Sequence, residues 1–142
     1  MVLHIIKLCV GITSVEQLVA HRAASCVRVK GHDGPVHVHV TRMMPRRAAE
    51  IEGAGSLYWV INGAIRCRQR IIQLARASDS EGKPCCHIIM APDLVRTVPR
   101  VKRPFQGWRY LTSGDAPGDL EVGDNSQNSA ELADELAHLG LI

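Results

Sequence analysis

No long apolar run occurs in the sequence, and this absence bears on where the protein works. A membrane-spanning helix needs roughly 18 to 20 consecutive apolar residues, and no stretch of the 142 residues approaches that length. The opening segment, MVLHIIKLCVG, is interrupted by His4 and Lys7 and is not followed by a small-residue cleavage site, unlike a signal peptide. We therefore expect a cytoplasmic protein that has no membrane partner.

Paired cysteine motifs are missing as well. The five cysteines form an odd set without any C-x-x-C spacing, which argues against a disulfide framework and a zinc knuckle. His37 and His39 share a face of a predicted strand and come nearest to a metal pair, but no third ligand follows at a clear spacing. We expect no metal, no cofactor, and thiols that are buried or idle.

Recognised catalytic motifs do not occur either. The chain has no G-x-G-x-x-G sequence, no P-loop, no G-x-S-x-G and no H-E-x-x-H. Sequence motifs therefore assign no reaction, and the catalytic residues, if any, stay unknown at this point.

Basic residues are absent from the C-terminal part of the chain. All 17 Lys and Arg residues lie at or before Arg109, whereas seven of the 14 acidic residues follow it. With 17 basic and seven acidic residues, residues 1–112 carry a net charge of +10, and the remainder carries −7. A basic body with an acidic tail is typical of proteins that bind RNA or another polyanion. A tail that folds back and neutralises its own body explains the same pattern.

The periodicities that are present predict helices and strands in one domain. A capping box at residues 13–17 and apolar residues at helical spacing predict a helix over about 14–25. Period-two alternation predicts a strand in VHVHVTRMM, at 36–44, and Pro45 suits the first position of a short helix. In this strand, the side chains expected to face inward are Val36, Val38 and Val40.

The order of these elements predicts an α+β fold. About six strands with hairpin connections indicate a mainly antiparallel sheet, with barrel-like closure as an option, beside one early helix, one short helix and a C-terminal helix. We expect a basic α+β domain over 1–112 and a flexible acidic linker over 113–127. The C-terminal amphipathic helix, 128–142, is expected to dock on the body through Leu132, Leu136 and Leu139.

Asn62 and Gly63 predict a two-residue hairpin loop, because both residues tolerate a positive φ. With this loop, Trp59 is expected opposite Arg66, so that Trp59 and alternate arginines share one face. An arginine stacked over an indole stabilises the fold by about 0.5 to 2 kcal/mol. The arginines can therefore have a purely structural role, in which they cover the tryptophan. Alternatively, Trp59, Arg66, Arg68 and Arg70 form a platform for phosphates and bases.

A second basic and aromatic segment, RVKRPFQGWRY, spans residues 100–110. Its interleaved composition is typical of single-stranded nucleic-acid binding, although Phe105 and Trp108 can instead fill the core. The candidate ligand-binding residues are Trp59, Arg66, Arg68, Arg70, Arg100, Lys102, Arg103, Trp108 and Arg109.

Four motifs resemble a small bacterial family found in alphaproteobacteria, domain-of-unknown-function family 1489. They are HIIKLCVG, VTRMMPRR, GSLYWVINGAIRCRQRI and RPFQGWRYL, and together the similarity covers nearly the whole chain. Because the family has no assigned activity, the resemblance implies no catalytic residue.

Three functions follow from these patterns. The first is a nucleic-acid (RNA) or phosphate-ligand binding module. The second is a small enzyme acting on an anionic substrate, with arginines as clamps and His37 or His39 as acid or base. That hypothesis requires the histidines and the Arg66 face to lie on the same side of the sheet. The third is a plain protein-interaction module.

Overall fold

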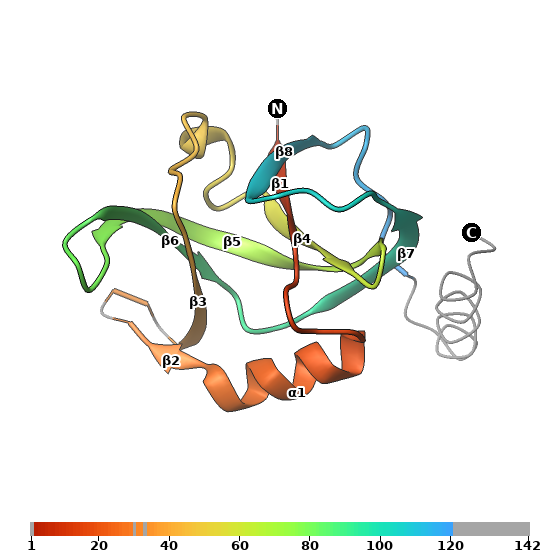
Figure 1. The fold of residues 1–142 in the computed structure, drawn as a ribbon, viewed down its shortest axis with the longest axis horizontal. Coiled ribbons are helices and arrows are strands. Elements are labelled where there is room, and N and C mark those ends of the chain that lie inside the picture. Colours follow the sequence, from red (N-terminus) through yellow and green to blue (C-terminus); the bar gives the residue numbers. More distant parts are fainter. Residues whose placement is uncertain (1, 30, 33, 121–142) are drawn as a thin grey trace.

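The computed structural model describes residues 2–29, 31–32 and 34–120, which form a sheet-rich α+β structure (Figure 1). One α-helix, α1, spans Val15–Ser25, and a single 3-10 turn, η1, spans Ala48–Glu50. The strands are β1 (Leu3–Leu8), β2 (Val27–Arg28), β3 (Pro35–Thr41), β4 (Ser56–Ile61), β5 (Ala64–Ser78), β6 (Pro84–Met90), β7 (Val95–Val101) and β8 (Trp108–Thr112).

Helix α1 begins where the sequence predicted. The Ser14 side chain caps it by accepting a 3.1 Å hydrogen bond from the Gln17 backbone N–H, which satisfies one of the free donors of the first turn. The short helix predicted from Pro45 onward is reduced to η1. None of the helices in the described part of the chain is long and apolar enough to cross a membrane.

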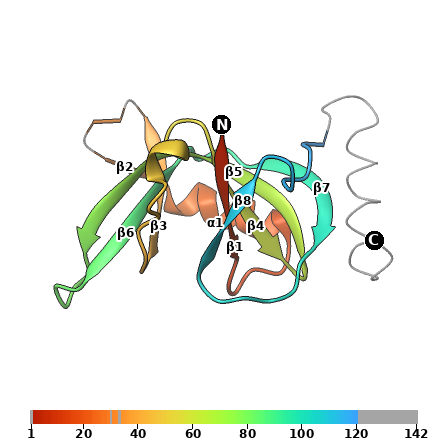
Figure 2. The ribbon, with the colours of Figure 1, turned by 90° about the horizontal axis from the view of Figure 1, so that it is seen from above.

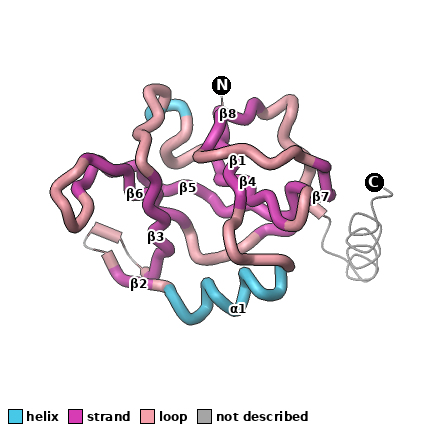
Figure 3. Tube along the Cα trace, viewed as in Figure 1, coloured by secondary structure: helices cyan, strands magenta, loops and turns pink. Residues whose placement is uncertain are grey.

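The strands form one mixed sheet in the order β2-β3-β6-β5-β4-β1-β8, with β7 also paired to β5. Strand β5 is 15 residues long and joins two wings: its first half pairs with β4 and β7, and its second half pairs with β6. Figure 2 shows these wings on either side, and Figure 3 shows α1 below them. Most pairings are antiparallel and β1 with β4 is parallel, so the main prediction is confirmed. The barrel-like option is wrong, because the sheet is not closed.

Two apolar clusters cover the two faces of the β1 and β4 wing. Alternate residues of these strands face α1, because successive side chains on a strand point to opposite faces. The larger cluster includes Ile5, Val15, Leu18, Leu57, Trp59, Ile61 and Cys67, and the smaller one consists of Ile6, Tyr58, Val60, Ile65 and Leu111.

The predicted hairpin forms, but its predicted register is wrong beyond the first two pairs. Asn62 and Gly63 adopt φ values of 51° and 83°, and Val60 pairs with Ile65 as expected. The register then shifts, so that Trp59 pairs with Cys67 and Tyr58 pairs with Arg68. Arg66 is the extra residue of a β-bulge. Arg68 and Arg70 therefore share the face of Tyr58, which is opposite to the face of Trp59.

The face predicted for β3 is also partly wrong. Val36 is buried as predicted, but Val40 is 53% exposed and His37 is only 5% exposed. His39 packs its ring edge-on against Trp59, with ring centroids 5.1 Å apart. Both histidines thus face the core side that α1 covers.

Residues 113–120, the start of the predicted linker, contact the body. The Gly118 carbonyl accepts a 2.8 Å hydrogen bond from the Val98 N–H, and the Leu120 N–H donates to the Arg96 carbonyl over 2.9 Å. The Asp119 carboxylate accepts from Arg68 at 2.7 and 2.8 Å. The rest of the linker and the predicted C-terminal helix lie outside the described residues, so the domain boundaries stay a prediction.

Gly55 is required where the chain enters β4. A Cβ at this position would lie 2.1 Å from the Leu3 carbonyl oxygen, which is backbone and cannot move aside alone. We expect Gly55→Ala to lower the free energy of unfolding by about 1–3 kcal/mol, the usual range for overpacking. Urea denaturation measures this, with Gly114→Ala as the control because its Cβ would meet nothing within 4 Å. Equal stability of the two variants would contradict the close packing.

Candidate functional site: a buried arginine beside a tryptophan

Arg22 occupies an apolar position of α1. It follows Val15 and Leu18 on the stripe that faces the sheet, and only 6% of its surface is exposed. Its guanidinium carbon lies 5.2 Å from the centre of the Trp59 ring, a cation–π contact. The helix therefore places a positive charge against the core.

Gln69, His37 and His21 hold the guanidinium in place. Its Nε donates to the Gln69 Oε1 over 3.2 Å. Its Nη1 lies 2.6 Å from the His37 Nε2 and 3.3 Å from the His21 Nδ1. Within residues 2–29, 31–32 and 34–120, no aspartate or glutamate pairs with Arg22, and its Nη2 has no hydrogen-bond partner. Burial lowers the pKa of Arg22, but a guanidinium stays protonated at neutral pH.

Gln69 connects the arginine to the tryptophan. Its fully buried side chain accepts a 2.9 Å hydrogen bond from the Trp59 Nε1 through the same oxygen that Arg22 contacts. Its Nε2 donates to the Ala91 carbonyl over 3.0 Å. One amide thus fixes the orientations of the indole and the guanidinium.

The two histidines of β3 are neutral at physiological pH. Burial, with Arg22 and His21 as charged or polar neighbours, lowers the pKa of His37 from 6.5 to about 4. Burial, followed by the charges of Lys7 and Arg22, lowers the pKa of His39 to about 4. Because a guanidinium can only donate, His37 accepts at Nε2 and its proton resides on Nδ1. That Nδ1 and the His39 Nε2 are buried without partners among the described residues.

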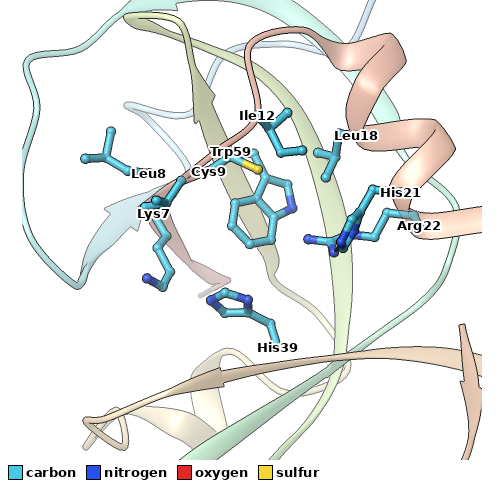
Figure 4. A pocket seen from close by; sticks show the side chains of 10 residues that line it. Lys7, Leu8, Cys9, Ile12, Leu18, His21, Arg22, His39 and Trp59 are labelled. Atoms are coloured by element: carbon cyan, nitrogen blue, oxygen red, sulfur yellow. Dashed lines mark hydrogen bonds between the residues drawn. The ribbon is translucent and has the colours of Figure 1, made fainter. Parts of the chain in front are cut away.

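A cavity of about 220 Å³ opens beside this cluster (Figure 4). Trp59 lies in the middle of the view, with Arg22 and His21 on one side and Lys7 on the other. Lys7 follows Leu3 and Ile5 on the inward face of β1, where a third apolar residue would complete the pattern. Burial raises the pKa of the Cys9 thiol, which also lines the cavity, to about 11, so the thiol stays protonated. We call this cavity the Arg22 pocket.

Of the residues predicted as a platform, Trp59 alone lines the Arg22 pocket. Arg66 is buried and donates to the Ile61 carbonyl over 2.7 Å. Arg68 contacts Asp119 and the Ser56 hydroxyl, and Arg70 donates to the Gly53 carbonyl over 3.2 Å. The predicted pairing of Trp59 with Arg66 is therefore wrong, whereas a ligand-binding role for these residues stays a prediction.

The residues predicted between 100 and 109 lie mainly at the surface. Arg100 donates to the Asp115 carbonyl over 2.8 Å, and the half-buried Trp108 donates to the Met43 carbonyl over 2.8 Å. Arg109 is exposed and stacks over Phe105 at 5.0 Å. Lys102 is half-buried and Arg103 is exposed. The structure does not gather these residues around Trp59.

Sequence reasoning missed Arg22, Gln69 and Lys7 as site residues. The available signal was a charged residue at a position where the periodicity of the helix or strand predicts an apolar one. Arg22 continues the helical stripe of Val15 and Leu18, and Lys7 continues the alternation of Leu3 and Ile5. Charged residues are rarely buried unless they are paired, so such positions suggest a ligand or a buried polar network.

The chain was compared with known families, curated proteins and solved structures. The family described as "Protein of unknown function (DUF1489)" matches residues 5–142. The chain belongs to this family. No curated protein and no solved structure matches it. Because the DUF1489 family has no described activity, membership does not indicate what the Arg22 pocket binds. The function of the pocket is inferred from its geometry.

The lowered pKa values of His37 and His39 predict that the folded protein loses stability in acid. An unfolded histidine gains its proton near pH 6.5, whereas His37 in the folded protein gains it near pH 4. The unfolded state therefore binds more protons between these values, and the stability present above pH 6.5 falls as the pH is lowered towards 4. We expect His37 to contribute roughly 3 kcal/mol of this loss.

Urea denaturation between pH 7.5 and 4.5 checks the expected loss. The groups that face His37 and His39 are Arg22 and His21 on α1, Lys7 on β1 and Cys9 after it. His37→Gln should flatten the pH dependence, and His87→Gln is the control because the hydrogen bonds of Arg22 go to His37, His21 and Gln69 and not to His87. An unchanged slope in the His37 variant would show that His37 is not the group that titrates.

Proposed function

We propose that the protein binds a small anionic ligand in the Arg22 pocket. The observation that carries the proposal is the buried guanidinium of Arg22, which has no carboxylate partner in the described part of the chain. Burying an unpaired charge costs several kcal/mol, and a bound anion would supply the missing countercharge. The proposal keeps the predicted binding of a phosphate-like ligand. It assigns this binding to Arg22 and not to the predicted platform of arginines.

The geometry suits recognition of an anion. Gln69 and His37 fix the Nε and Nη1 atoms, so the Nη2, which no described residue contacts through a hydrogen bond, has a defined direction before any ligand arrives. Donors that are oriented in advance reduce the entropy lost on binding. The Trp59 ring and the side chains of Ile12 and Leu18 offer apolar surface to the rest of the ligand. Because His37 and His39 are neutral, they add no positive charge beside Arg22 and Lys7.

Cytoplasmic location belongs to the same proposal. It is supported by the five cysteines, which are all free thiols, as expected in a reducing compartment. Recognition of a small anion requires no catalytic residue, and the protonated Cys9 thiol does not favour a nucleophilic role.

Thermal unfolding in the presence of small anions tests the proposal. Acetate and inorganic phosphate at low millimolar concentration, with ionic strength held constant by sodium chloride, should raise the melting temperature in a saturable way. Stabilisation by a ligand follows its occupancy of the folded state and reaches about 2.7 kcal/mol at a hundredfold excess over Kd. If neither anion stabilises the protein beyond the chloride control, the proposed function is wrong.

A second candidate function, binding of RNA or another polyanion, is favoured by the surface of β8. Tyr110 is 38% exposed, and the Arg47 guanidinium lies over its ring at 5.8 Å. Exposed Arg103 and Arg109 lie in the same part of the chain. Binding of single-stranded RNA by such cations should weaken steeply with salt, and filter binding over a salt series measures it. A flat response, or no binding at low salt, would remove this candidate.

A further inference from the structure

Lys7 is a second cation of the Arg22 pocket without a partner. It lines the cavity from β1, and its ammonium makes no hydrogen bond or ion pair with any residue that the structure describes. In β1 it stands at an inward position, paired in register with Trp59 of β4. The sequence thus places a charge at a position that packing alone would fill with an apolar residue.

The two cations approach the indole from opposite sides. In Figure 4, Arg22 enters from α1 on one side of Trp59, and Lys7 lies on the other side next to His39. Both charges act on His39 and on Cys9, so both lie within electrostatic range of the cavity centre. The His39 Nε2, which has no partner among the described residues, lies at this second polar end.

The space between the two ends is small and mainly apolar. Its 220 Å³ correspond to on the order of seven water molecules, which is room for a chain of about four to six carbon atoms. The walls between the cations include the Trp59 ring, Cys9, Ile12 and Leu18. A ligand that fits a pocket with a cation at each end and apolar walls between them has an anionic group at each end and a short apolar middle.

We propose that the ligand of the Arg22 pocket is a small dicarboxylate, with one carboxylate on the Arg22 Nη2 and the other on the Lys7 ammonium beside His39. This inference rests on the proposed function and adds the chemical class of the ligand. A carboxylate matches the planar fork of a guanidinium, and the second carboxylate supplies Lys7 with a countercharge that no residue in the described part of the chain provides.

Isothermal titration calorimetry with ligands of matched size tests the inference. Succinate and butyrate both have four carbons but differ in the second carboxylate, and malonate and glutarate vary the spacing. At constant ionic strength, succinate or glutarate should bind about tenfold or more tightly than butyrate, as expected for one added charge-assisted hydrogen bond. Lys7→Gln should remove this preference, so that succinate and butyrate bind the variant with similar affinity. Lys83→Gln, with the same change in net charge at an exposed site, should retain it.

Folding of the Lys7 variant is checked by circular dichroism, and Lys7→Arg keeps the charge if Lys7→Gln does not fold. The arginine variant should then preserve the preference for the dicarboxylate. If butyrate and succinate bind equally, or if phosphate alone binds, the dicarboxylate inference is overturned while the proposed function stands. If none of these anions binds, the proposed function itself fails.

Discussion

Replacing Gln69 with leucine should destabilise the protein by about 3 to 6 kcal/mol, because three buried groups lose their partners at once. These groups are the Trp59 N–H, the Arg22 Nε–H and the Ala91 carbonyl. Leucine has a similar size, so the loss reports hydrogen bonding more than volume. Urea denaturation measures the change in the free energy of unfolding.

Gln73→Leu on the same strand is the matched control for this variant. Gln73 is exposed, and a surface substitution of this kind changes stability by about 0.5 kcal/mol or less. Equal losses in the two variants would mean that Gln69 does not hold the indole and the guanidinium together.

Replacing Arg22 with methionine should abolish the stabilisation that anions give to the wild-type protein. The unliganded variant is expected to lose about 1–3 kcal/mol of stability at most, because the His37 Nε2 loses its donor while the cost of the uncompensated buried charge is removed. Acetate at a hundredfold excess over its wild-type Kd should then add nothing, compared with about 2.7 kcal/mol for the wild type. Thermal and urea unfolding with and without acetate measure the difference.

Arg68→Met is the control for the arginine variant. Arg68 lies on the opposite face of β4 and β5, and Asp119 already supplies its countercharge. It should keep the full response to acetate. If Arg22→Met retains the response and Arg68→Met loses it, the anion binds at Arg68 on the opposite face of the sheet and not in the Arg22 pocket.

Local signals in the sequence predicted much of the fold. A capping box with Thr13 or Ser14 as the cap was expected to begin α1, and Asn62 with Gly63 was expected to form the hairpin loop, because each residue has a direct effect on its own backbone. The structure confirms both. These features depend on neighbours within four residues, and a single sequence contains that information.

The bulge at Arg66 could not be predicted in the same way. The alternation of Arg66, Cys67, Arg68 and Gln69 is compatible with either register, and one added residue reverses the face of all that follow. The buried polar Gln69 is the residue that marks the true register.

The inward histidines of β3 are a similar case. Valine and histidine alternate along this strand, so periodicity alone gives two equivalent faces. The choice is made by a tertiary contact, the approach of Arg22 from α1 to His37. The candidate site therefore depended on contacts between residues 15 to 47 positions apart, which the sequence patterns do not specify.

The central claim is that the buried guanidinium of Arg22 binds an anion from outside the protein. Heteronuclear NMR of ¹⁵N-labelled protein tests it most directly, because the Arg22 Nε–H and the Trp59 Nε1–H both contact Gln69. Titration with succinate should shift both resonances in the wild type, and the shifts should be absent in Gln69→Glu, whose carboxylate supplies an internal countercharge. The claim is contradicted if both resonances stay unmoved while succinate shifts only residues 100–109.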